Sequence, residues 1–339
     1  SDVYKRQQIW FQSAMAIARI GPPAAAATET LIRSLSESDD QRRYRAAFAL
    51  GKIGPDALPA LLDALHDDSS RVREGSARAM GWMSIDSEQV IAALIDTMDD
   101  SDDDVRRVAA ESVASQGVRA ESQLAQALGS ESPTLQESAA HALSLMEVES
   151  SETASALMSA LQTAEGVRRA DILIALVRSR TDRQQLVSVV ADALANDDPA
   201  IRDAGMMGLQ RLGSSAAAVL PKLVEMLDSD QSGQRDLAAR AIGMLGDAGA
   251  AAIPAMLEAL DRADDQQIII RAISDIGPKA VPALLTAQGD DQRLAEALAA
   301  IGGQAESEVT AAIANDDEYV RQRAVRALGG MQPVPPVSY

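Results

Sequence analysis

Apolar and polar residues follow each other along this chain in a pattern that repeats about every thirty residues. Each copy has an acidic pair, a stretch with apolar residues at helical spacing, an interruption at a Gly, and a second stretch with the same spacing. A repeat of this length predicts paired helices that bury their apolar faces against neighbouring pairs. The equivalent apolar positions are Leu50, Met80, Val113, Leu143, Leu176, Leu209, Ile242, Ile273, Leu298 and Leu328, and a further copy is centred on Ile17.

Residues that start and end helices occur at fixed places in each copy. Asp197 precedes the first apolar stretch of its copy, where a carboxylate can accept hydrogen bonds from free backbone N–H groups. Gly213 follows that stretch, as expected where a helix ends in a left-handed residue. Pro221 lies where the first turn of the second helix is expected. Each copy therefore predicts one helical hairpin.

The copies share an acidic pair, then Val-Arg as at Val72 and Arg73, then Leu-Gly-x-Ile-Gly as in 50–54, then Pro-x-Leu as in 59–61. This order of residues resembles the short HEAT-like repeats found in bilin-lyase subunits and in many bacterial proteins. The resemblance covers nearly the whole chain. It implies an all-α fold, a right-handed α-α superhelix (solenoid) of about eleven short helical-hairpin repeats, with the first and last incomplete.

The repeats run from residue 8 to 330 without a change in composition, so we expect one elongated solenoid domain. Residues 1–7 include DVYKRQ, which looks like the translated end of a transposon used to make sequencing libraries, and we treat them as an artefact. The chain is then expected to be a fragment of a bacterial protein from a metagenome, so a missing signal peptide carries no information on its compartment. Residues 331–339 contain three prolines and predict a proline-rich tail.

Composition and charge restrict the possible partners. The chain has 50 acidic and 31 basic residues, a net charge of -19, which repels phosphate backbones and anionic lipid headgroups. We therefore expect no nucleic acid partner, and no apolar run approaches the ~18 residues of a membrane span. Aromatic residues make up 2% of the chain, so the core must consist of Ala, Leu, Ile, Val and Met. The absence of Cys excludes thiol catalysis and disulfides.

The sequence predicts no catalytic residue, cofactor or metal. The two histidines, His66 and His141, lie in different repeats, without the close spacing that a zinc site usually shows. A related repeat family that hydroxylates deoxyhypusine holds iron through His-Glu pairs, and this chain has no His-Glu dipeptide. It also lacks a Gly-rich phosphate loop and a nucleophile elbow. The acidic clusters, such as 99–104, are expected to be solvated helix starts rather than calcium sites.

One arginine recurs in most copies near the start of the first helix. A ladder of this kind could bind an anionic ligand, but an Arg one turn inside a helix can also pair with the acidic residues at its start or in the next repeat. We expect the second arrangement, in which the arginines join neighbouring repeats. The ladder consists of Arg43, Arg73, Arg106, Arg168, Arg202, Arg235 and Arg321.

Exposed positions of the second helices form the candidate binding surface. In stacks of this family the second helices line the concave side, so the resemblance implies a polar-to-acidic groove there. Such a groove suits a basic or neutral peptide. Trp82 is expected either in the core or as an exposed interface anchor. The candidate partner-binding residues are Asp63, Gln89, Asp96, Gln126, Gln185, Asp192, Glu225 and Glu258.

These observations favour a non-catalytic scaffold that binds a partner protein or peptide on its concave face. The alternative, which only the family resemblance implies, is a bilin (phycobilin) lyase-like or chaperone-like subunit. The sequence gives no indication of the oligomeric state.

Overall fold

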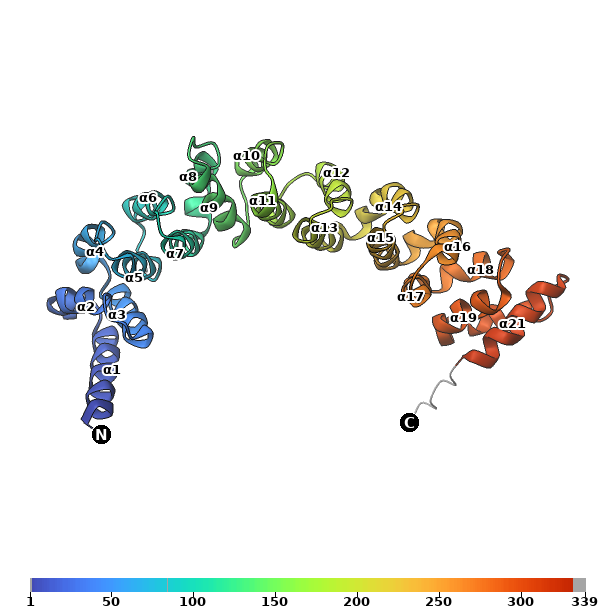
Figure 1. Ribbon diagram of the computed structural model, residues 1–339, viewed down its shortest axis with the longest axis horizontal. Helices are drawn as coiled ribbons and strands as arrows, with labels where there is room; N and C mark the ends of the chain where they lie inside the picture. Colours follow the sequence, from blue (N-terminus) through green and yellow to red (C-terminus); the bar gives the residue numbers. More distant parts are fainter. Residues whose placement is uncertain (1, 84, 332–339) are drawn as a thin grey trace. The chain divides into compact units, whose positions relative to one another are not determined.

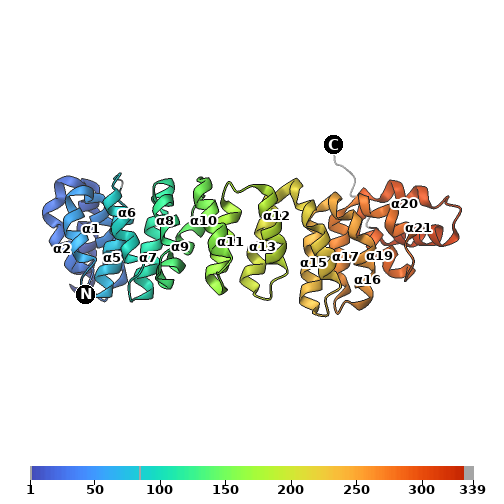
Figure 2. The ribbon, with the colours of Figure 1, turned by 90° about the horizontal axis from the view of Figure 1, so that it is seen from above.

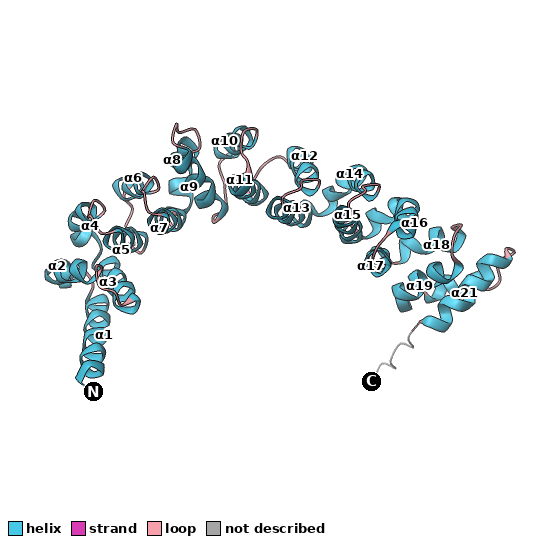
Figure 3. Ribbon diagram, viewed as in Figure 1, coloured by secondary structure: helices cyan, strands magenta, loops and turns pink. Residues whose placement is uncertain are grey.

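The computed structural model describes residues 2–83 and 85–331, with side chains described from Ile9 onward except at positions 214 and 261. Helices and connecting loops account for all of this part of the chain, and none of it forms a strand (Figure 3). The predicted all-α solenoid is therefore confirmed. Apart from Met331, the predicted proline-rich tail lies outside the described residues.

The chain divides into two units, 1–181 and 182–339. In both units long first helices alternate with shorter second helices (Figure 1). The first unit contains α1 (Asp2–Ile20), α2 (Thr28–Ser34), α3 (Asp40–Ile53), α4 (Leu58–Ala64), α5 (Ser70–Gly81), α6 (Glu88–Thr97), α7 (Asp103–Ala114), α8 (Glu121–Ala127), α9 (Pro133–Ser144), α10 (Ser151–Leu161) and α11 (Gly166–Arg178).

The second unit follows the same alternation, beginning with a second helix. It contains α12 (Arg183–Leu194), α13 (Pro199–Leu212), α14 (Leu220–Leu227), α15 (Ser232–Met244), α16 (Ile253–Arg262), α17 (Gln266–Ile276), α18 (Val281–Thr286), α19 (Asp291–Ile301), α20 (Glu306–Ala312) and α21 (Glu318–Gly330). Short 3₁₀ helices join first to second helices at Pro22–Ala27, Gly54–Ala57, Gly117–Ala120, Gly213–Val219, Gly246–Ala252, Pro278–Ala280 and Gly302–Gln304.

The first repeat has both of its helices, α1 and α2, so the expectation that it is incomplete was wrong. The signal that was missed is Gly21, followed by Pro22. Gly21 has φ 69°, close to the φ 74° of Gly54, and both residues turn the chain from a first helix into a 3₁₀ helix. The last described repeat has a first helix only, α21, as expected.

The predicted core positions are buried as the repeat requires. The nine equivalent positions from Leu50 to Leu298 are at most 2% exposed. The tenth, Leu328 on α21, is half-buried. Ile17 on α1 is also half-buried. Residues on the outermost described first helices lack a covering repeat on one side, which leaves these two side chains partly open.

The first helices of each unit pack against one another more extensively than the second helices do. A Cβ on Gly51 of α3 would lie 2.8 Å from the carbonyl oxygen of Ala79 on α5, and a Cβ on Gly243 of α15 would lie 2.9 Å from that of Ala272 on α17. Glycine thus lets the backbones of first helices approach closely. Figure 2 shows the helices of each unit side by side in chain order.

A stack curves toward its more closely packed layer, and within each unit the first helices lie on the inner side of the curve (Figure 1). The expectation that the second helices line the concave side was therefore wrong for both units. The reason is physical: Gly51 and Gly243 let the backbones of neighbouring first helices approach closely.

Candidate functional site

The eight candidate partner-binding residues are all exposed, and all lie on second helices. The structure brings three of them together: Gln89 and Asp96 of α6 and Gln126 of α8 line one groove of about 580 Å³. We name this the α6–α8 groove. The periodic spacing of the sequence placed these side chains on the exposed faces of second helices, but the groove itself depends on how α6 and α8 are set against each other.

The α6–α8 groove combines an apolar strip with polar edges. Ile95 of α6 and Leu135 of α9 contribute apolar surface, and Glu88 and Gln123 add a carboxylate and an amide beside the three candidate residues. Hydrogen-bonding groups around an apolar strip are the usual composition of a surface that binds an extended peptide.

Glu258 lies in a second groove, of about 380 Å³, between α16 and α18. Ile253, Leu257 and Ala283 form its apolar part. The remaining candidates lie exposed on α4, α12 and α14 and are not among the residues that line either groove; they are Asp63, Gln185, Asp192 and Glu225.

The repeated arginines have one structural role. Each donates a hydrogen bond to the carbonyl oxygen of the residue five or six positions earlier, where the preceding second helix ends, at 2.7–3.2 Å. Gln136 makes the same bond to Ser130 in the repeat of α9, which has no arginine at this position. These bonds satisfy carbonyl groups that a helix end leaves without partners. The ladder joins elements within and between repeats, as expected.

Arg73 also connects two repeats. Its Nε and Nη2 donate to the two carboxylate oxygens of Asp100 at 2.7 and 2.9 Å, and both side chains are largely buried. Burial favours the neutral form of Asp100. The hydrogen bonds from Arg73 and from the backbone N–H of Asp102, together with the charges of Arg73 and Arg106, outweigh burial and hold the pKa of Asp100 below its ordinary value. The pair is a charged joint between α5 and the loop before α7.

The acidic clusters act mainly as helix starts. The Asp102 carboxylate accepts hydrogen bonds from the backbone N–H groups of Asp104 and Val105, and Asp198 caps α13 in the same way. The cap of α13 is Asp198, one residue after the predicted Asp197, because Pro199 is the first helical residue. In the part of the chain that the structure describes, no three His, Asp or Glu side chains are grouped closely enough to hold a metal ion.

His141 is the one histidine with a charged partner that the described contacts include. Its Nδ1 lies 3.4 Å from a carboxylate oxygen of Asp171 on the next first helix. The hydrogen bond to Asp171 raises the pKa of His141 above its ordinary value, although partial burial opposes the shift. The pair borders a groove of about 290 Å³ that α7, α9 and α11 line, the α7–α11 groove.

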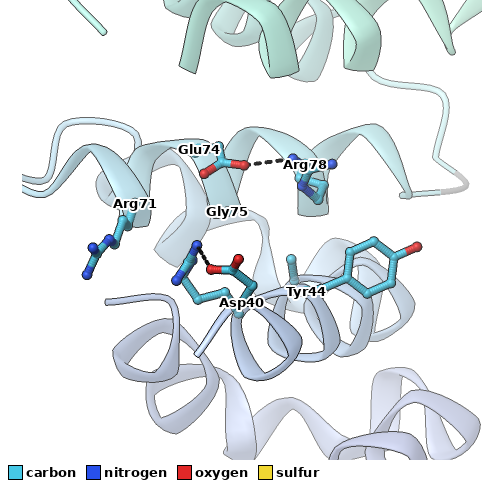
Figure 4. A pocket seen from close by; sticks show the side chains of 8 residues that line it. Asp40, Tyr44, Arg71, Glu74, Gly75 and Arg78 are labelled. Carbon is cyan, nitrogen blue, oxygen red and sulfur yellow. Dashed lines mark hydrogen bonds and ion pairs between the residues drawn. The ribbon is translucent and has the colours of Figure 1, made fainter. Parts of the chain in front are cut away.

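A further groove lies between the first helices α3 and α5, where no binding residue was predicted from the sequence. The α3–α5 groove, of about 240 Å³, is lined by two charged rows with the buried Ala47 and Gly75 between them. Figure 4 shows Asp40 and Tyr44 on one side and Arg71, Glu74 and Arg78 on the other. Tyr44 also contacts Trp82, with ring centroids 5.0 Å apart. The signal in the sequence was the concentration of aromatic residues before position 83.

Two protein-family models match stretches of this sequence. A model of HEAT repeats matches residues 28–114 and 100–177, and a model of the PBS lyase HEAT-like repeat matches residues 234–262. The chain belongs to the HEAT-like repeat proteins. The HEAT-like repeats therefore occur in both units, where the regular hairpins are found.

Solved structures of the karyopherin Kap121p share this HEAT-like fold at low sequence identity. The karyopherin Kap121p bound to the extreme C-terminus of the protein phosphatase Cdc14p is 17% identical with a TM-score of 0.51, over 93% of this chain and 42% of that chain. Kap121p bound to Pho4p gives 17% and 0.51, over 95% and 43%. YibA of E. coli is 22% identical with a TM-score of 0.49, over 73% and 91%. No curated protein matches the sequence.

The karyopherin matches establish the fold alone, and this chain spans less than half the length of Kap121p. Within the described residues, every helix is too short or too polar to cross a bilayer.

Proposed function

We propose that this HEAT-like repeat chain is a non-catalytic scaffold that binds a partner protein or peptide in grooves between its repeats. The observation that carries the proposal is the meeting of Gln89, Asp96 and Gln126 in one open groove with apolar side chains between them. That the solved Kap121p is bound to the extreme C-terminus of another protein supports this use of the fold.

The α6–α8 groove favours a basic or neutral segment. Glu88 and Asp96 supply negative charge at its edge, while Gln89, Gln123 and Gln126 supply neutral donors and acceptors. The apolar strip with Ile95 would cover an aliphatic side chain of the partner. A Lys or Arg beside that side chain would be attracted to the two carboxylates.

Selection from a random peptide display library tests the proposal with the purified chain. We expect peptides with a Lys or Arg next to an apolar residue, and a Kd that rises about tenfold or more in the double variant Asp96→Arg and Gln126→Arg. Asp203→Arg, an exposed position on first helix α13, is the matched control and should bind unchanged. Selected peptides that bind the double variant as tightly as the Asp203→Arg control would contradict the proposal.

The PBS lyase HEAT-like match at residues 234–262 is the one observation that favours the alternative, a bilin lyase-like or chaperone-like subunit. Adding a phycobilin to the purified chain distinguishes the two. A scaffold leaves the visible absorption of the bilin unchanged, whereas a new absorption band that depends on the chain would support the alternative.

A further inference from the structure

The amino-terminal repeats differ in charge from the rest of the molecule. Residues 8–80 contain 9 Lys or Arg and 9 Asp or Glu, a net charge of 0, whereas residues 81–339 contain 20 and 40, a net charge of -20. Within the amino-terminal repeats, positive charge lies on first helices: α3 carries four basic residues and one acid, and α5 carries three and one. This end of the chain does not repel an anionic partner as the rest does.

Aromatic side chains are concentrated in the same repeats. Between residues 83 and 318 the chain has none, whereas Trp10, Phe11, Tyr44, Phe48 and Trp82 lie on or directly after α1, α3 and α5. A core of small aliphatic residues serves the other repeats, so packing alone does not require aromatic rings here. Aromatic residues with exposed edges are the residue type most often found at the centre of binding interfaces.

Three of these rings form one cluster at the side of the α3–α5 groove. Trp82 packs edge-on against Tyr44 and Phe48, with centroids 5.0 and 5.7 Å away. Trp82 packs closely on α3, since a Cβ on Gly51 would lie 2.9 Å from the Cβ of Trp82. Tyr44 stays 52% exposed. The cluster therefore has an accessible edge.

The groove beside the cluster carries more positive than negative charge. Arg43 donates to Asp40 at 2.5 Å and Arg78 donates to Glu74 at 2.7 Å (Figure 4). Arg71 is exposed and makes no ion pair or hydrogen bond with any residue that the structure describes. Three guanidinium groups thus face two carboxylates, which leaves one cation and several unused N–H donors for a ligand.

Two further grooves that first helices line in this unit have no excess of arginine. The α7–α11 groove is lined by Arg106, Arg107 and His141 and by the carboxylates of Asp103, Glu137 and Asp171. The groove beside α9 and α11 has Arg168 against Glu137 and Glu165, and neither groove is lined by Phe, Trp or Tyr. The combination of excess arginine and exposed aromatic surface is therefore a property of the α3–α5 groove and not of the repeat.

We propose that the α3–α5 groove and the ring cluster beside it bind an acidic peptide segment that carries an apolar or aromatic side chain. Arg71 pairs with one carboxylate of that segment, and Arg43 and Arg78 orient a second carboxylate. The apolar side chain of the segment packs on Tyr44 and Trp82. A peptide fits better than a nucleic acid, because Asp40 and Glu74 within the groove repel a continuous phosphate backbone. The inference shares with the proposed function only the premise that the chain binds peptides.

Fluorescence anisotropy with three labelled probes tests this inference on the full chain. The probes are a short peptide of alternating Glu and Phe, the same peptide with Lys in place of Glu, and a single-stranded oligo-dT. We expect the Glu peptide to bind with a Kd that rises with salt, and the other two to bind much more weakly. Equal binding of the Lys peptide, preferred binding of oligo-dT, or no binding of the Glu peptide would overturn the proposal.

Variants locate the site. Arg71→Glu and Tyr44→Ser change exposed side chains and should each raise the Kd of the Glu peptide, Arg71→Glu by roughly tenfold. Arg240→Glu is the matched control, since Arg240 occupies on α15 the repeat position of Arg78 and lies outside the groove. An equal loss in Arg240→Glu would show a general charge effect and refute the assignment. The Asp96→Arg and Gln126→Arg variant should bind the Glu peptide unchanged, which separates this test from that of the α6–α8 groove.

The emission of Trp82 gives a second readout. In a Trp10→Phe background Trp82 is the single Trp of the chain, and the bound peptide should shift its emission to shorter wavelength as the ring is covered. Binding without any change in this emission would place the peptide elsewhere.

Discussion

At the scale of single residues, the recurring arginine performs a task that a core of Ala, Leu and Val cannot. Its guanidinium donates to carbonyl groups at the end of the preceding second helix, and in Arg73 it also joins Asp100 of the next repeat. Polar groups that lose water without gaining a partner destabilise a fold, so these bonds matter more than surface ion pairs.

Removing one such arginine should therefore lower stability. We expect Arg73→Ala to reduce the free energy of unfolding by about 2 kcal/mol, because Asp100 and two carbonyl groups lose a charged donor. Arg211→Ala, at an exposed position on α13, should change it by less than about 0.5 kcal/mol. Urea unfolding curves of the three proteins measure both values, and equal losses would contradict this role.

His141 makes stability depend on pH in a defined direction. Its pKa in the folded protein is raised above the ordinary 6.5 by Asp171. The pair therefore stabilises the folded state fully when the pH is below 6.5, the pKa of His141 in the unfolded chain. This stabilisation is lost as the pH rises through the higher pKa that His141 has in the folded protein. Compared with His141→Gln, the wild-type chain should gain stability as the pH falls through this range. Parallel pH profiles of the two proteins would show that the pair contributes nothing.

At the scale of helices, the hairpins could be predicted from the sequence because their signals are local. Asp198 starts α13 and Gly213 ends it, within one residue of the prediction. The inner and outer layers could not be predicted, because the curvature depends on how closely Gly51 and Gly243 let first helices approach. The α3–α5 groove was missed for the same reason: its rows come from two repeats whose relative rotation no local signal encodes.

Glycines at contacts between first helices should tolerate no side chain. In Gly243→Ala the added Cβ would lie 2.9 Å from the carbonyl oxygen and 3.0 Å from the Cα of Ala272, so α15 and α17 must separate. We expect a loss of about 1–3 kcal/mol in the free energy of unfolding.

Gly233→Ala on the same helix is the control. Nothing lies within 4 Å of its added Cβ, so the better helix propensity of Ala should stabilise α15 by up to about 1 kcal/mol. Thermal unfolding of both variants decides the matter, and a stabilised Gly243→Ala would refute the close approach of these backbones.

At the scale of the whole molecule, the chain combines one repeated architecture with an uneven distribution of charge and aromatic residues. The repeat determines that each hairpin is stabilised mainly by its neighbours. The uneven composition determines that grooves of similar shape differ in chemistry, with acids and amides at α6–α8 and arginines and rings at α3–α5. Specificity is therefore a property of particular repeats.

Amide hydrogen exchange of Leu209→Ala tests this account most directly. Leu209 is 2% exposed in the core of α13, and its truncation should cost about 2–5 kcal/mol locally. In a stack held by neighbouring contacts, protection should fall most in α12 to α15 and stay unchanged in α3 to α7. An equal loss of protection from α3 to α21 would mean that the molecule unfolds as one globular core, and would contradict the solenoid on which both binding proposals depend.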